Sequence, residues 1–213
     1  ARLSNDGVTY TEPLPIPCIK ERLYRERYEG RLWMKYEFNA EYLPDDLTCV
    51  VEPMRGLEVS VNGYSLTQSG DWWYDRTFLC YPIGAAAETG RAAVTVSFDY
   101  YQSEHVYYVL FGGVTETMRN CLVFDTEIEN IYLVGSFCVR SDGGYREGER
   151  GTLLSDGAFT LIPQQSTVDL SDITGDGYPF YGGTVDAECS YVWHEGEPTV
   201  LRLGGRYALA RIS

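Results

Sequence analysis

The fold class is decided by the stretch Leu57-Glu58-Val59-Ser60-Val61-Asn62-Gly63. Apolar and polar side chains alternate along it, so that Leu57, Val59 and Val61 share one face of an extended strand. The pair Asn62-Gly63 follows at once and favours the positive φ angles of a tight hairpin turn. The stretch therefore predicts a half-buried β-strand that ends in a hairpin turn.

The same alternation recurs along the chain. Val94-Thr95-Val96-Ser97-Phe98 repeats it after a turn at Thr89-Gly90, and residues 152–154 and 158–162 are expected to form a hairpin around Ser155-Asp156-Gly157. Further strands are expected at residues 32–42, 48–52, 77–83, 106–111, 121–124, 130–139, 184–192, 199–203 and 207–212. The helical candidates are short, at residues 18–28 and at the turn 85–88. Many short strands with regular turn signals predict an all-β fold, a β-sandwich or jelly roll.

The composition changes after Arg140. Residues 141–151 carry almost no apolar side chains and are expected to form an exposed loop. We expect one β-sandwich over residues 1–140, and over residues 141–213 a linker loop with the strands of part of a second β-sandwich unit. A short echo of Leu57–Ser60 at residues 210–213 favours a chain that stops partway through that second unit. The alternative is that the last strands complete the first sandwich.

Charge and composition exclude several classes of protein. The 213 residues include 17 Lys and Arg against 31 Asp and Glu, which gives a formal net charge of −14. Such an acidic surface repels a polyanion, so nucleic acid is not expected as a partner. With 44% hydrophobic residues the chain is expected to fold. No stretch approaches the ~18 consecutive apolar residues of a membrane-spanning helix, so no membrane partner is expected, and the compartment stays open.

The cysteines and histidines indicate no metal or cofactor site. The six cysteines stand singly, with no C-x-x-C pair, which argues against a zinc site or a dense disulfide scaffold, and most lie in apolar runs, as buried thiols do. His105 and His194 are the only histidines, and the chain has no H-E-x-x-H, G-x-S-x-G or Walker A motif. We therefore assign no cofactor, metal ligand or catalytic residue.

The segment Asp172-Ile173-Thr174-Gly175-Asp176-Gly177 has the opening spacing of a calcium-binding loop. Position 12 of that loop falls on Gly183, where an EF-hand needs a bidentate glutamate. The segment is therefore expected to be a turn that enters the next strand, because Asp-Gly readily adopts a positive φ.

Two aromatic clusters are the candidates for ligand contact. Sugar-binding sites typically combine an aromatic face with groups that hydrogen-bond to hydroxyls. The loop Asp71-Trp72-Trp73-Tyr74-Asp75 offers both, with Arg76 as a further donor. The second cluster lies in a glycine-rich loop. The candidate carbohydrate-binding residues are Asp71, Trp72, Trp73, Tyr74, Arg76, Tyr178 and Tyr181. The alternative is that these rings cap the core or pack against a neighbouring domain, and one of Trp72 and Trp73 is expected in the core because adjacent strand residues face opposite sides.

Several segments, in their order along the chain, carry a resemblance to a known family. Residues 57–63, 71–75, 81–83 and 94–101 resemble successive segments of the galactose-binding-like jelly roll, the sugar-binding domain of family 2 and related glycoside hydrolases. Residues 125–137 and 177–185 are similar to a stretch in large bacterial glycosidase-like proteins, where one sandwich gives way to the next. In that family the catalytic residues lie in a separate barrel domain, so the resemblance implies an accessory module.

We therefore expect a non-catalytic module of a larger bacterial glycoside-hydrolase-like protein, which binds carbohydrate or braces the catalytic domain of the same polypeptide. The first alternative is a structural or protein-interaction β-sandwich without sugar affinity. The second is a self-contained glycosidase, which needs two carboxylates about 5–9.5 Å apart. Glu127 and Glu129 are candidates for such a pair, and solvated charge at a strand edge is the other explanation for them.

Overall fold

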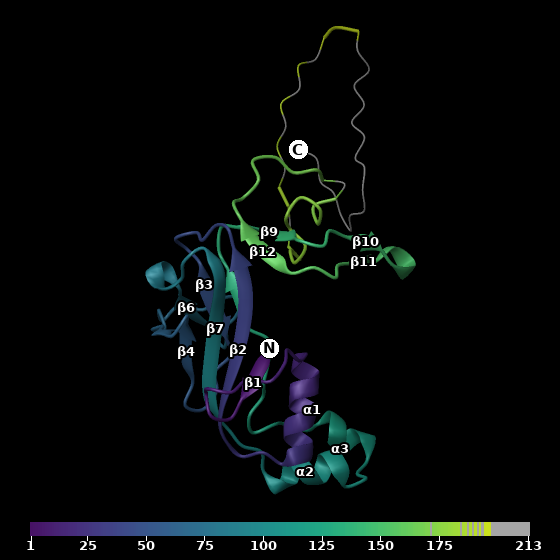
Figure 1. Cartoon of the computed structure of the whole chain (residues 1–213). Helices are drawn as coiled ribbons and strands as arrows, with labels where there is room; N and C mark the ends of the chain where they lie inside the picture. The colour runs from purple at the N-terminus through teal and green to yellow at the C-terminus, as the bar shows by residue number, and fades with distance from the viewer. Residues whose placement is uncertain are drawn as a thin grey trace.

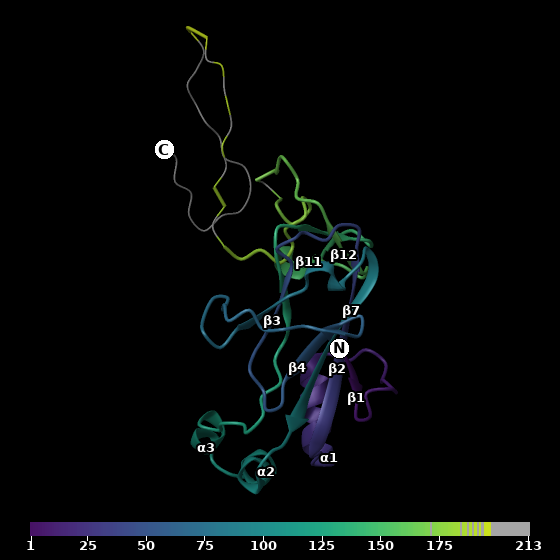
Figure 2. The ribbon, with the colours of Figure 1, turned by 90° about the vertical axis from the view of Figure 1, so that its left-hand side faces the viewer.

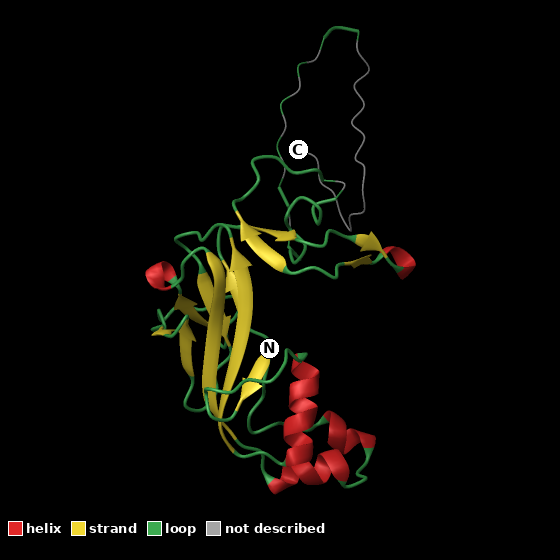
Figure 3. Ribbon diagram, in the orientation of Figure 1, coloured by secondary structure: helices red, strands yellow, loops and turns green. Residues whose placement is uncertain are grey.

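Figure 1 shows the chain as a computed structural model, which describes residues 1–170, 172–183, 185, 186, 188, 190, 192 and 194–196. Most of the regular structure is β-strand, arranged in several sheets, and the helices are few (Figure 3). The predicted predominance of β-structure is confirmed. Across the described residues no helix has the length and apolar character that a membrane crossing needs.

A seven-stranded sheet forms the larger layer, in the order β5-β4-β7-β2-β12-β9, with β1 also paired to β2. Its strands are β1 (Arg2–Ser4), β2 (Gly30–Ala40), β4 (Glu58–Val61), β5 (Tyr64–Ser65), β7 (Gly90–Tyr100), β9 (Cys138–Ser141) and β12 (Phe159–Ile162). The long strands β2 and β7 pair antiparallel along their whole length. The opening stretch of the sequence behaves as predicted: β4 turns into β5 through Asn62 and Gly63, whose φ angles are 48° and 86°.

A second sheet has three strands, in the order β6-β3-β8. They are β3 (Thr48–Val51), β6 (Leu79–Pro82) and β8 (Tyr132–Val134), and a separate two-stranded ribbon joins β10 (Arg146–Glu147) to β11 (Leu153–Leu154). The core cluster contains alternate residues of the large sheet, such as Met34 and Val96, together with Cys49 and Val51 of the second sheet. The alternation read from the sequence thus places one face of each sheet in a shared core.

Three helices lie at the end of the molecule opposite the β9–β12 region (Figures 1 and 2). They are α1 (Ile16–Glu26), α2 (Glu104–Phe111) and α3 (Glu116–Asn120), and short 3-10 turns occur at Gly84–Ala86 and Glu149–Gly151. The predicted helix at 18–28 is confirmed as α1. It begins with a proline in the first turn, buries Ile16, Ile19 and Leu23 on one side, and ends where Arg27 adopts a left-handed conformation.

Two predicted strands are wrong. Residues 106–111 form most of helix α2, because the apolar run also fits helical spacing, with Val106 and Val109 buried. Residues 121–124 pair with no strand: Cys121 ends α3, where its N–H donates to the Thr117 carbonyl, and the ring of Phe124 stacks on a tyrosine of α1. At both places, tertiary packing that involves a helix outweighed the local preference for a β-strand.

The predicted hairpin around Ser155-Asp156-Gly157 is also wrong. β11 pairs with β10, and β12 pairs with β9, so the chain reverses at Glu149–Gly151. Gly143 and Gly157 lie backbone against backbone, at a separation that leaves no room for a Cβ on Gly157. The lack of a side chain at Gly157 therefore lets two segments of the chain lie in close contact.

The predicted strand 130–139 is divided between the two sheets. β8 belongs to the small sheet and β9 to the large one, and the crossing between them is held by Asp46. The carboxylate of Asp46 accepts the backbone N–H of Ser136 at 2.9 Å and its hydroxyl at 2.7 Å. These bonds lower the pKa of Asp46, the backbone bond most strongly.

The region after residue 140 contributes to the large sheet. β12 pairs parallel with β2, with Thr160 opposite Asn39. The division into units at 1–140 and 141–213 stays a prediction. In the predicted strand 184–192, the described residues 185, 186, 188, 190 and 192 belong to no strand, whereas the strands predicted at 199–203 and 207–212 lie wholly outside the described residues.

Candidate functional site

The loop between β5 and β6 is a tight reversal held by its own hydrogen bonds. The N–H of Trp73 donates to the carbonyl of Phe78 at 3.1 Å, and the N–H of Phe78 donates to the carbonyl of Asp75 at 3.2 Å. The carboxylate of Asp75 accepts the N–H and the hydroxyl of Thr77 at 2.7 and 2.6 Å, which lowers the pKa of Asp75. Tyr74 completes the turn with a φ of 66°. The loop is thus ordered before any ligand arrives.

This loop holds an aromatic platform, which we define as Trp72, Trp73, Tyr74, Phe78 and Tyr132. The ring of Trp73 is the centre: its centroid lies 5.6 Å from Tyr132, 6.0 Å from Phe78 and 6.2 Å from Tyr74. The rings of Phe78 and Tyr132 meet edge to face. Such tilted and edge-to-face contacts are the favourable geometries for aromatic pairs, and they fix the Trp73 ring.

The expectation that one of the two tryptophans lies in the core is wrong. Trp72 is 54% exposed and Trp73 39% exposed, and Tyr74 beside them is 84% exposed. The two residues belong to a loop in which only Trp72 bridges to Leu79, so strand alternation does not decide their facing. Trp73 rests on Phe78 and Tyr132 at the surface.

The polar candidates of the loop are also at the surface. Asp71 and Arg76 are exposed, and the N–H of Asp71 donates to the hydroxyl of Ser69 at 3.1 Å. The five candidate residues from Asp71 to Arg76 therefore belong to one exposed loop, in which aromatic faces and polar groups are neighbours.

Tyr178 and Tyr181 form a separate cluster. Their rings meet edge to face at 6.2 Å. A hydrogen bond with the Cys138 thiol and burial raise the pKa of Tyr178, which ties this residue to β9 of the large sheet. The neighbouring Phe180 packs on Phe159 of β12. The two predicted clusters thus lie on different sheets, each with its own ring contacts.

Sequence reasoning missed Phe78 and Tyr132 as members of the platform. Tyr132 reaches it because β8 pairs with β3, with Val50 opposite Tyr132, while β6 pairs along the other edge of β3. A pairing between residues so far apart in sequence leaves no local signal. The position of Tyr132 between Ile131 and Leu133, both packed against the core, could have marked it as outward-facing.

The carboxylate pair proposed from the sequence has a cation between its members. Glu127 and Glu129 lie outside any strand, and the ammonium group of Lys20 lies 3.1 Å from Glu129 and 3.8 Å from Glu127. One helix cation therefore lies between the two carboxylates, which do not lie on a sheet edge. His105 is exposed on the first turn of α2.

The segment at Asp172–Gly177 is a turn, as predicted. The carboxylate of Asp172 accepts the N–H of Gly175 at 3.1 Å, that of Asp176 accepts the N–H of Asp169, and Gly177 has a φ of 99°. Within the described ranges, no group of three or more His, Cys, Asp or Glu residues is placed to hold a metal ion.

The thiols follow the sequence interpretation in part. Cys49, Cys80 and Cys138 are buried and unpaired, whereas Cys18 and Cys121 are exposed. Burial raises the pKa of Cys49 to about 12, so this thiol stays protonated at neutral pH. Cys189 lies outside the described residues.

No protein-family model matches the chain, and no curated protein matches it.

Proposed function

We propose that the chain is an accessory carbohydrate-binding module of a larger glycoside-hydrolase-like protein, built on a galactose-binding-like jelly roll. The single observation that carries the proposal is the exposure of three consecutive aromatic residues, Trp72, Trp73 and Tyr74, on a loop that is locked by hydrogen bonds. A cluster of exposed aromatic side chains of this kind marks a site for a ligand or a protein partner.

The chemistry of the loop matches a pyranose. A sugar ring has an apolar C–H face that can lie on an indole, and hydroxyls at its rim that need hydrogen bonds. Asp71 supplies an acceptor and Arg76 supplies donors beside the rings. Because the Trp73 ring is already fixed by Phe78 and Tyr132, little side-chain entropy is lost on binding.

The same platform supports the bracing role. Aromatic residues are enriched at protein interfaces, and Tyr132, 40% exposed, extends the platform onto the small sheet. In this second form the platform packs against the catalytic domain of the same polypeptide and binds no sugar.

Titration of the isolated chain with mono- and oligosaccharides, followed by tryptophan fluorescence, tests the proposal. Sugar binding at the platform predicts a saturable change that Trp73→Ala abolishes. The matched control is Tyr64→Ala, which removes a 66% exposed ring of β5 outside the platform and should leave the response unchanged. If no sugar changes the fluorescence, and Trp72→Ala and Trp73→Ala alter only stability, the sugar-binding form is wrong. Turnover of aryl glycosides by the chain would contradict a non-catalytic module.

A further inference from the structure

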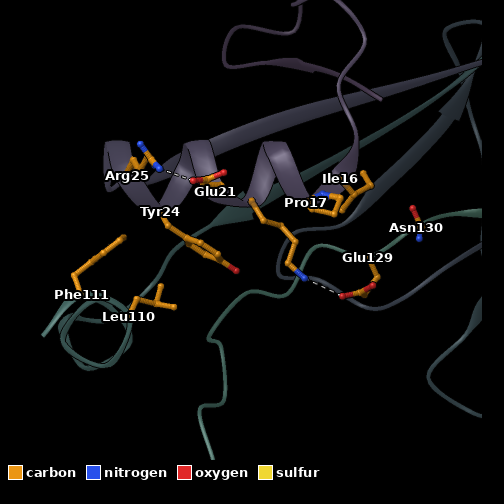
Figure 4. A pocket seen from close by; sticks show the side chains of 10 residues that line it. Ile16, Pro17, Glu21, Tyr24, Arg25, Leu110, Phe111, Glu129 and Asn130 are labelled. Carbon is orange, nitrogen blue, oxygen red and sulfur yellow. Dashed lines mark hydrogen bonds and ion pairs between the residues drawn. The ribbon is translucent and has the colours of Figure 1, made fainter. Parts of the chain in front are cut away.

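A hollow with one apolar and one polar wall lies between α1 and the C-terminal end of α2 (Figure 4). Its volume is about 450 Å³, within the ~300–1,000 Å³ typical of small-molecule sites. Its main lining residues are Lys20, Tyr24, Leu110, Phe111, Glu129 and Asn130, and we call it the helix hollow. None of them belongs to the aromatic platform.

The apolar wall offers an aromatic surface with a fixed orientation. Tyr24 stacks on Phe124, with ring centroids 5.4 Å apart and planes 11° from parallel. Leu110 and Phe111 lie across the hollow from Tyr24, and Phe111 is 58% exposed (Figure 4). An exposed aromatic ring next to a held one suits the C–H face of a small ring compound.

The polar wall offers both donors and acceptors. The ammonium group of Lys20 is 3.1 Å from the carboxylate of Glu129, and Asn130 lines the hollow on the same side (Figure 4). Burial, and then the charges of Glu127 and Glu129, raise the pKa of Tyr24 to about 12. The Tyr24 hydroxyl therefore keeps its proton at neutral pH and can donate a hydrogen bond.

The charges of the lining balance. Lys20 is paired with Glu129 at 3.1 Å, and Arg25 and Glu21, which also line the hollow, are paired at 2.6 Å. Glu127 lies outside the lining, 3.8 Å from the ammonium group of Lys20. An anionic ligand would meet two carboxylates and a cationic ligand two cations, whereas a neutral ligand with hydroxyls can bond to all four groups. The lining therefore favours a neutral polyhydroxyl compound.

The hollow and the platform loop flank the same residue. Glu52 follows β3, and its pKa is raised by burial first and then by the charges of Glu129, Glu127 and Asp75. Asp75 belongs to the platform loop and Glu129 to the hollow, so both features lie within electrostatic range of one carboxylate.

We propose that the helix hollow binds one neutral pyranose, with its C–H face on Tyr24 and Phe111 and its hydroxyls on Lys20, Glu129 and Asn130. This second site rests on the proposed function, because it assigns a further sugar subsite to the same module. The two sites can be separated by experiment, since Trp72 and Trp73, two of the four tryptophans, lie in the platform, and no tryptophan among the described residues lines the hollow.

Amide NMR spectra of the full chain, titrated with methyl glycosides of neutral hexoses up to about 50 mM, test the hollow directly. The expected result is a saturable shift of the amides of Lys20, Tyr24 and Asn130. Phe111→Ala should weaken binding about two- to tenfold, the range for loss of one aromatic contact. The matched control is Tyr108→Ala, which removes an equally exposed ring from the same helix outside the hollow and should change affinity less than twofold.

A charge comparison tests the balance of the lining. Glucuronate and glucosamine should both bind more weakly than glucose, and binding of either as tightly as glucose overturns the assignment to a neutral ligand. If the platform tryptophans respond to sugars and the hollow amides do not, the hollow inference is wrong and the proposed function stands. If the hollow responds and the tryptophans do not, the hollow inference stands and the platform assignment fails. If neither the amides of the hollow nor the platform tryptophans respond to any sugar, both the hollow inference and the platform assignment are wrong.

Discussion

Replacement of Gln102 should destabilise the protein by an amount that its hydrogen bonds set. Gln102 is buried between the end of β7 and the start of α2. Its side-chain amide donates to the carbonyl of Thr126, and its side-chain oxygen accepts the N–H of Asp125 at 3.0 Å. It thereby anchors the segment that leads to Glu129 and Asn130.

Gln102→Leu keeps the side-chain volume close to that of the glutamine and removes these two hydrogen bonds, together with a long donation of the amide to the Tyr100 hydroxyl at 3.4 Å. A buried polar group left without a partner costs about 1–3 kcal/mol. Thr126 is buried, so the loss of the bond to its carbonyl should carry the full free-energy cost. Asp125 is exposed, so water can replace part of the hydrogen bond that its N–H loses. The expected loss is therefore about 2–4 kcal/mol of unfolding free energy. Urea unfolding at pH 7, followed by circular dichroism, measures it.

Gln102→Glu removes the hydrogen-bond donor of the side chain and keeps its acceptor. The introduced carboxylate still accepts from Asp125, but it faces the Thr126 carbonyl without a proton to donate. Burial and this carbonyl raise the pKa of the introduced group in the folded state, so the deficit against wild type should shrink as the pH falls through that pKa. The reasoning is refuted if Gln102→Leu unfolds within about 0.5 kcal/mol of wild type, or if the deficit of Gln102→Glu is the same at pH 5 and pH 7.

Three further predictions concern the close contact at Gly157, the reactivity of the thiols and the pH dependence of stability. Gly157→Ala should lower the unfolding free energy by about 1–3 kcal/mol, because a Cβ there collides with another backbone, whereas Gly182→Ala, with open space around it, should have little effect in the same thermal melt. Cys49 should resist a thiol reagent at pH 7 until the protein unfolds, while Cys18 reacts at once; fast labelling of Cys49 in the folded protein, located by mass spectrometry, would contradict its burial. The lowered pKa of Asp46 means that its stabilisation is present above the unfolded pKa and is lost as pH falls through the folded pKa. Asp46→Asn should therefore lose under about 1 kcal/mol at pH 7 and nothing in strong acid, and an equal loss at both pH values, measured by urea unfolding, would refute the role of the charge.

The elements that the sequence predicted correctly are those with a strong local signal. The Leu57–Gly63 stretch carries both its alternation and its turn, and the pattern of β7 is equally regular. The apolar run that became α2 carries no such signal, because six apolar residues fit either period. Its helical state depends partly on the bond from the N–H of Ser103 to the carboxylate of Asp125, which no local pattern reveals.

The candidate site shows the same division. The loop residues from Asp71 to Arg76 could be found because they are adjacent in sequence and rich in aromatic residues. Tyr132 joins them only through the pairing of β3 with β8. The helix hollow is composed from three separate segments, so its lining could not be assembled before the fold was known.

The parallel pairing of β12 with β2 has a consequence for synthesis on the ribosome. β2 ends at Ala40 and β12 ends at Ile162, so Asn39 and Ala40, the residues of β2 that pair with β12, must wait for about 120 further residues. At roughly 5–20 residues per second, that edge stays without its partner for about 6–24 seconds. An open strand edge is a template for pairing with another chain. A nascent chain interrupted before residue 159 should therefore be the species that aggregates, and the arrival of β12 should end that hazard.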